Sequence, residues 1–257
     1  MMRKRIICLL MLGMALTGYA QVTSGNFQYE YKMVRLDSTW DDKIDPALQE
    51  YVDIKRQQMA EMTSVVIGHA ERTLTAFVPE SPLSNFLTTL LLERGPQYVD
   101  DPQFDQCDLS ILNFGGIRAQ IPAGDITVGD IYDLSPFDNS LVFLLIKGSE
   151  LRKALMRFTD MVNAPMAGVE MVYRNRKPAS IRIQHKPLDD QQYYKVITLD
   201  FIAKGGDHIL SDIEFEKSVV TGMFFRDFLI EEIREMTKEG KSVDGRLEGR
   251  VEIERQP

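Results

Sequence analysis

Alternating and continuous apolar runs along the chain predict a set of β-strands. Phe27 to Leu36 alternates aromatic or apolar residues with polar ones, which predicts a half-buried strand. Leu141 to Ile146 has no polar alternation, which indicates a strand buried on both faces. Shorter apolar runs predict further strands within 65–76, 109–112, 169–173, 181–183, 194–199 and 250–253.

Helical spacing and helix-end residues mark the segments between these strands. A first helix opens at Asp45-Pro46, with Asp45 as its cap, and runs to about Met62. A densely apolar helix spans 84–92 between prolines and Gly95-Pro96. Two more are expected from Ser149 and over 224–236. Strands and helices mixed without strict alternation predict an α+β (α/β mixed) fold, a mixed β-sheet with helices packed on it.

Composition places this pattern in an ordinary globular chain. Of 257 residues, 44% are hydrophobic and 26% charged, enough apolar content for a sizeable core. The formal net charge is −8, which argues against a nucleic-acid polymer as partner. A small anionic ligand stays compatible with this charge if a few arginines or backbone N–H groups are placed at its phosphate.

The first 20 residues resemble a secretory signal peptide. Arg3, Lys4 and Arg5 precede a short apolar run, and small residues end at Ala20, where cleavage is expected. The run is too short to span a bilayer, and no later stretch is long enough either. We expect an exported protein, periplasmic or extracellular, with a signal peptide at 1–20, a strand and helix extension at 21–64 and one domain at 65–257.

The few cysteines and histidines do not predict a metal site. Cys8 lies inside the signal segment, so Cys107 remains alone, without an internal disulfide, and is expected to be a buried structural thiol. His69 and His185 are expected to be structural or surface residues, because no two histidines share a ligand-like spacing.

Three polar segments follow apolar runs and carry candidate binding chemistry. In Asn113 to Arg118, an amide ends a strand, paired glycines free the backbone and an arginine can fork onto phosphate or ribose oxygens. Leu134 to Asn139 places Phe137 on a turn, where it either stacks on a base or fills the core below. Asp200 to His208 carries Asp207 after two glycines, free to project into a cleft. Together they describe an aromatic clamp with polar edges.

In this order and spacing, the three segments resemble the C-terminal domain of the 5'-nucleotidase family, which includes UDP-sugar hydrolases. The resemblance spans roughly 65–253 and rests on Asn-x-Gly-Gly-Ile-Arg, Pro-Phe-x-Asn and Phe-x-Ala-x-Gly-Gly-Asp. It implies that two phenylalanines sandwich a base, that the Asn contacts this base, that the Arg reaches ribose and phosphate, and that the Asp holds the ribose hydroxyls. The substrate-binding residues expected from it are Asn113, Gly115, Gly116, Arg118, Phe137, Phe201, Gly205, Gly206 and Asp207.

Three positions depart from the family pattern. Pro82 stands where an additional arginine is usual, which weakens the expected grip on phosphate. Phe114 and His208 each stand where glycine is common, so base or sugar preference is expected to differ.

The resemblance also shapes the expected activity. Family enzymes hydrolyse phosphate esters with two metal ions held by an N-terminal metallophosphatase domain, and no comparable sequence precedes residue 65. We therefore expect the nucleotide- or nucleoside-recognition half of an exported 5'-nucleotidase, with no cofactor or catalytic residue in this chain and divalent metals in a separate metallophosphatase chain. The alternative is a non-catalytic nucleoside-binding protein. An independent hydrolase is disfavoured, because no nucleophile lies beside a positioned base.

Overall fold

The computed structural model describes residues 30–35, 37–38 and 45–254. The chain divides after Glu50, and residues from Tyr51 onward form one compact unit. The predicted signal peptide lies outside the described residues, as do Phe27 to Tyr29 and Leu36 of the predicted first strand. Over 30–35 the strand prediction is wrong: these residues are exposed and not paired in a sheet, and a strand needs a neighbour to exchange backbone hydrogen bonds.

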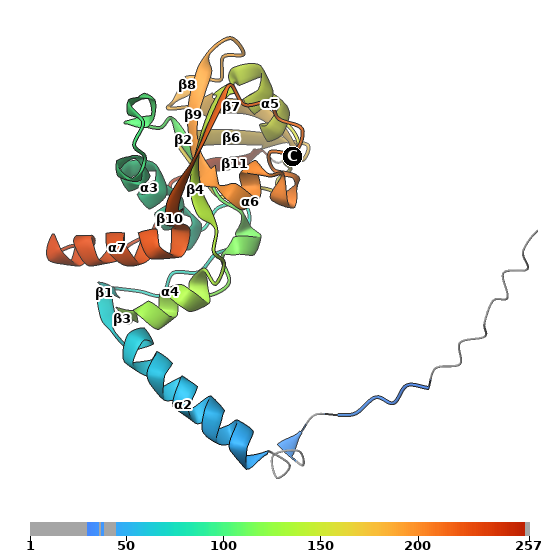
Figure 1. Ribbon diagram of the computed structural model, residues 1–257. Helices are drawn as coiled ribbons and strands as arrows, with labels where there is room; N and C mark the ends of the chain where they lie inside the picture. Colours follow the sequence, from blue (N-terminus) through green and yellow to red (C-terminus); the bar gives the residue numbers. More distant parts are fainter. Residues whose placement is uncertain (1–29, 36, 39–44, 255–257) are drawn as a thin grey trace, which may run out of the picture. The chain divides into compact units, whose positions relative to one another are not determined.

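A five-stranded mixed sheet forms the centre of this unit, in the order β10-β4-β9-β2-β5 (Figure 1). Its only parallel pair is β2 with β9, and the other neighbours are antiparallel. The strands are β2 (Leu109–Ile111), β4 (Ser140–Lys147), β5 (Met166–Ala167), β9 (Tyr193–Leu199) and β10 (Lys217–Phe224). The continuous apolar run 141–146 thus lies inside β4, flanked by strands on both sides, as its lack of alternation predicts.

The remaining strands form a second sheet and a separate pair. The second sheet has the order β11-β6-β7-β8, with β11 and β6 parallel. It consists of β6 (Val169–Arg174), β7 (Lys177–Ile183), β8 (Lys186–Pro187) and β11 (Val251–Glu254). The pair joins β1 (Val66–Ala70) and β3 (Gly124–Thr127).

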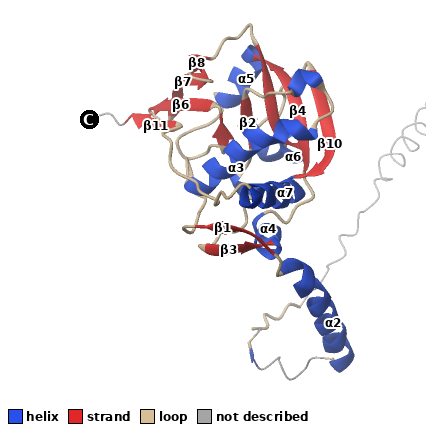
Figure 2. Ribbon diagram, turned by 90° about the vertical axis from the view of Figure 1, so that its left-hand side faces the viewer, coloured by secondary structure: helices blue, strands red, loops and turns tan. Residues whose placement is uncertain are grey.

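Helices cover and connect these sheets. α7 lies between the five-stranded sheet and the β1–β3 pair and contacts both β10 and β1 (Figures 1 and 2). α3 packs on β2 and β5, whereas α5 and α6 pack on β4. The α-helices are α2 (Pro46–Thr63), α3 (Pro82–Arg94), α4 (Val128–Leu134), α5 (Gly148–Leu155), α6 (Asp200–Ala203) and α7 (Phe225–Lys238). Short 3-10 turns include η4 (Phe114–Gly116) and η5 (Gly206–His208).

Local sequence explains where α2 and α3 begin. The backbone N–H of Ala47 donates to the Asp45 carboxylate at 2.9 Å, so Asp45 caps α2 as predicted. At α3, Ser81 and Ser84 form a reciprocal capping box, and Pro82 occupies the first turn, where its missing N–H costs nothing. The proline that replaces the family arginine is therefore part of a helix start.

The architecture confirms the predicted α+β class with mixed sheets and packed helices. β3, α4 and β10 were not among the predicted elements, because β3 and α4 are short and because β10, although eight residues long, does not alternate polar and apolar residues. Among the described residues, no helix is both long enough and apolar enough to cross a bilayer.

Candidate functional site

The first predicted segment forms the end of β2 and the turn η4. Asn113, 6% exposed, donates from its Nδ2 to a carboxylate oxygen of Asp207 at 2.6 Å. Its Oδ1 is buried and makes no hydrogen bond within the described part of the chain. The structure thus brings together the two residues that the sequence assigned to base and ribose, although they lie far apart in the chain.

Close approach to Asn113, and not an unusual backbone angle, explains the paired glycines. A Cβ on Gly116 would lie 2.7 Å from Oδ1 of Asn113, closer than non-bonded atoms approach. A Cβ on Gly115 would lie 3.4 Å from Asp207 and 3.5 Å from Nδ2 of Asn113, which is ordinary contact. Gly116 is therefore required by the Asn113 side chain, whereas Gly115 has room for a Cβ.

The third segment, over α6 and η5, has a left-handed backbone that presents Asp207. Gly205, Asp207 and His208 have φ of 90°, 51° and 57°. Glycine adopts this conformation freely, and Asp and His adopt it more readily than most other residues. His208 thus keeps the backbone conformation expected of the family glycine it replaces. A Cβ on Gly206 would collide with the Phe201 ring at 2.4 Å, so this glycine makes room for the ring.

The second segment joins the other two through backbone contacts. The N–H of Arg118 donates to Leu134 O at 2.9 Å, which ties the glycine turn to the end of α4. The N–H of Ser140 donates to the Asp200 carboxylate at 3.2 Å, which ties the Phe137 turn to the start of α6. The three segments are therefore linked where β2 and β9 end and β4 begins.

Both predicted stacking rings are accessible. Phe137 is 41% exposed and Phe201 is 40% exposed, so the alternative in which Phe137 only fills the core is wrong. Half-exposed aromatic rings on tethered turns are suited to stacking on a flat ligand. Arg118 is exposed as well and donates one N–H to Gly115 O at 3.3 Å, which leaves most of its donors free.

A buried arginine beside this site was missed by the sequence reasoning. Arg226, 9% exposed, donates to the Asp138 carboxylate at 2.7 Å, and its guanidinium lies 4.4 Å from the centre of the Tyr132 ring. Burial lowers the pKa of Arg226, but the hydrogen bond to Asp138 and the neighbouring acidic groups outweigh it and raise the pKa above its usual value. Its signal in the sequence was a charge on the apolar helix face formed by Leu229, Ile230 and Ile233.

His69, His185 and Cys107 lie outside the candidate site, whereas His208 belongs to its third segment. His69 and His185 have side chains 51% and 83% exposed and contact Asp125 and Glu170, which confirms them as surface residues. Burial raises the pKa of the half-buried Cys107 thiol to about 12. In the described ranges, no three His, Cys, Asp or Glu side chains are grouped so that they could hold a metal ion.

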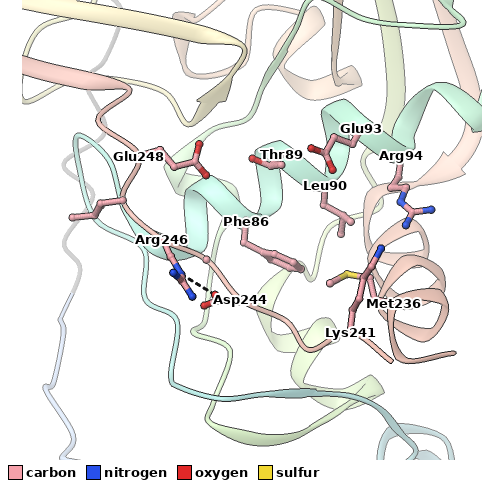
Figure 3. A pocket seen from close by; sticks show the side chains of 12 residues that line it. Phe86, Thr89, Leu90, Glu93, Arg94, Met236, Lys241, Asp244, Arg246 and Glu248 are labelled. Carbon is pink, nitrogen blue, oxygen red and sulfur yellow. Dashed lines mark hydrogen bonds and ion pairs between the residues drawn. The ribbon is translucent and has the colours of Figure 1, made fainter. Parts of the chain in front are cut away.

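A cavity of about 430 Å³ lies elsewhere, between α3 and the segment after α7 (Figure 3). Phe86, Leu90 and Met236 line its apolar part, and none of the predicted site residues lines it. Its cations already have acidic partners, Arg94 and Lys241 with Glu239 and Arg246 with Asp244. This cavity therefore offers no unpaired charge for a phosphate.

Comparisons with known proteins agree with the geometry. The family model of the 5'-nucleotidase C-terminal domain matches residues 66–212, a range that contains every predicted site residue. Protein UshA of Yersinia enterocolitica is 38% identical over 105 residues, which cover 39% of this chain and 19% of UshA. The trifunctional nucleotide phosphoesterase YfkN of Bacillus subtilis is 24% identical over 225 residues, which cover 81% of this chain and 15% of YfkN.

A solved structure has a similar fold. The 5'-nucleotidase precursor of Thermus thermophilus superimposes with a TM-score of 0.68 and 28% identity, over 81% of this chain and 43% of that one. The chain thus spans less than half the length of each of these three proteins.

Proposed function

We propose that this chain, which belongs to the 5'-nucleotidase C-terminal domain family, is the nucleotide- or nucleoside-recognition half of an exported 5'-nucleotidase. Hydrolysis then requires a separate metallophosphatase chain that holds the divalent metals. The supporting observation is that hydrogen bonds link the three segments, namely Asn113 to Asp207, Arg118 N–H to Leu134 O and Ser140 N–H to the Asp200 carboxylate, and that the Phe137 and Phe201 rings on these segments are accessible.

Each group at this site has chemistry suited to one part of a nucleoside. Phe137 and Phe201 offer flat apolar faces for the base. One carboxylate oxygen of Asp207 accepts from Asn113, and the other makes no hydrogen bond among the described residues, so it is available to ribose hydroxyls. Arg118 supplies the cation for a 5'-phosphate. Asn113 holds Asp207 in place before the ligand arrives.

In this proposal the present chain binds the ligand and a separate chain hydrolyses the phosphate ester. No step of phosphate hydrolysis is assigned to the described residues, and the proposed metals belong to the partner. α2 is consistent with a partner, because none of its residues is buried. From Tyr51 onward it exposes large apolar side chains, at Tyr51 (60%), Met59 (61%) and Met62 (66%). Such a helix gains little stability by itself in water.

Calorimetric titration with adenosine and AMP tests the recognition function. We expect the protein without its first 20 residues to bind both, and Phe137→Ala and Phe201→Ala each to weaken binding at least tenfold. Phe77→Ala is the matched control, because Phe77 is equally accessible, 49% exposed, but lies outside the three segments. A wild-type protein that binds neither ligand contradicts the proposal.

A phosphate-release assay with added Mn²⁺ tests the division between chains. We expect no phosphate release from AMP by this chain alone, and release when a metallophosphatase partner is added. Tight adenosine binding with much weaker AMP binding would instead favour the non-catalytic nucleoside-binding protein, for which Pro82 in place of the family arginine is the supporting observation. Rapid release by this chain alone contradicts both functions.

A further inference from the structure

A buried arginine, Arg226, contacts the turn that carries Phe137. Arg226 lies in the first turn of α7 and donates to Asp138, the residue directly after Phe137, at 2.7 Å. The Asp138 side chain is 70% exposed, whereas the Arg226 side chain is only 11% exposed. The buried partner is thus anchored in the molecule, and the exposed partner belongs to the turn.

The anchor has its own rigid supports. The Arg226 guanidinium lies 4.4 Å from the centre of the Tyr132 ring, on the α4 helix that leads into the turn. The backbone N–H of Phe225, next to Arg226, donates to Asn139 O at 2.8 Å. Arg226 and its neighbour Phe225 therefore attach α7 on both sides of Phe137, through Tyr132 before it and through Asp138 and Asn139 after it.

Burial of this arginine has a structural cost that the fold alone does not explain. Its Nε is buried and lacks a hydrogen-bond partner among the described residues, and the Asp227 carboxylate, at 3.9 Å from it, is too far away to accept one. A buried unpaired donor is unfavourable, and an aliphatic side chain would fill the same helix face without it. What the arginine adds is a directional contact with the Phe137 turn.

We propose that Arg226 is a positioning residue: through Asp138 it fixes the turn so that the accessible Phe137 ring is already oriented to receive a base. This rests on the proposed recognition function. A stacking ring on a fixed turn loses little conformational freedom when the ligand binds, so the contact acts on affinity. Arg226 itself does not touch the ligand.

Asp138→Asn is the test variant, because it removes the charge of an exposed side chain and keeps its shape. We expect adenosine to bind about fivefold more weakly, with a melting temperature within about 2 °C of the wild type. Arg226→Lys should bind adenosine with an affinity between those of the wild type and Asp138→Asn, because lysine keeps the positive charge but lacks the planar group that lies over the Tyr132 ring. Glu235→Gln is the matched control, because it breaks the exposed Glu235–Lys238 pair at the other end of α7.

A double-mutant cycle separates positioning from a general loss of stability. In a Phe137→Ala background, Asp138→Asn should change the affinity less than twofold, because the ring through which it acts is gone. An equal loss in both backgrounds, or no loss in the wild-type background, overturns the proposal.

Hydrogen exchange in the ligand-free protein keeps this test independent of the proposed function. Asp138→Asn should speed exchange of the amides within 135–140, and Glu235→Gln should not. If the wild type binds no nucleoside, the recognition function fails, but faster exchange in Asp138→Asn still supports the inference that the Arg226–Asp138 contact fixes the turn. Unchanged exchange in Asp138→Asn contradicts the inference that the Arg226–Asp138 contact fixes the turn, even if the protein binds nucleoside.

Discussion

At the scale of single residues, the candidate site depends on how closely Gly116 approaches Asn113. A Cβ at Gly116 would lie 2.7 Å from Oδ1 of the buried Asn113, so Gly116→Ala has to displace that side chain and break its hydrogen bond to Asp207. We expect a loss of about 1–3 kcal/mol in the free energy of unfolding and a Kd for adenosine raised about tenfold. Urea denaturation and calorimetry measure these effects.

Gly222→Ala is the control for this substitution, because a Cβ at Gly222 meets no atom within 4 Å. It should leave both stability and affinity nearly unchanged. Equal effects of the two substitutions would mean that the crowding at Asn113 is relieved at no cost to the site.

The Cys107 thiol gives a second prediction at this scale. Burial raises its pKa to about 12 from an ordinary value of 9.0, so the folded state favours the neutral thiol. At pH 9, about half of the thiols are ionised in the unfolded chain, but only about one in a thousand in the folded protein. We expect alkylation by iodoacetamide at pH 9 to be at least a hundredfold slower in the native protein than in urea. Comparable rates would show that the thiol is accessible and ordinary.

Sequence motifs placed Asn113 and Asp207 in one site, but they did not indicate how the Phe137 turn is held. Asn113, Phe201 and Asp207 could be assigned because strand-end glycine turns have a recognisable pattern, and the structure does bring Asn113 and Asp207 into contact. The role of Arg226 could not be assigned, because it depends on α7 packing beside the Phe137 turn, 88 residues away from Asp138 along the chain. Contacts of this range are fixed only by the fold.

At the scale of elements, Glu80 joins α3 to the last strand. Its carboxylate accepts from the side chain of Asn85 at 2.6 Å and from the backbone N–H groups of Glu248 at 2.7 Å and Gly249 at 3.1 Å. Glu80→Ala removes the shared acceptor of these partly buried hydrogen bonds, which should cost about 1–3 kcal/mol in the free energy of unfolding. Hydrogen exchange should also increase over 246–254, which includes β11.

Glu93→Ala is the control on the same helix, because Glu93 is exposed. It should change the free energy of unfolding by less than about 0.5 kcal/mol. The idea that Glu80 holds the C-terminal segment fails if exchange over 246–254 rises equally in both variants.

Elements were predictable from sequence where burial is one-sided or complete. β4 and α7 have continuous or helically spaced apolar residues, and both were predicted nearly to their ends. Over 30–35 the alternation predicts a strand, but a strand also requires a neighbouring strand, and no strand forms over these residues. β10 was missed because its sequence does not alternate: Val219 and Val220 are adjacent, and Thr221 and Gly222 follow them.

At the scale of the whole molecule, the fold and the recognition site should not require α2. None of its residues is buried, whereas every predicted site residue lies between Asn113 and Asp207 in the family domain. We expect a chain that starts at Thr63 to melt within about 2 °C of the protein without its first 20 residues and to bind adenosine with a Kd within twofold. Differential scanning calorimetry and titration measure both.

The same truncation separates recognition from catalysis by a partner. The accessible apolar side chains of Tyr51, Met59 and Met62 are removed with α2, so stimulation of phosphate release by a metallophosphatase chain should fall at least tenfold while adenosine binding persists. Tyr51→Ser in the longer chain, a change on an exposed helix face, should reduce the stimulation in the same direction with no change in fold. Full stimulation of the truncated chain would place the partner's contact on the family domain itself, and loss of adenosine binding would mean that α2 supports the site.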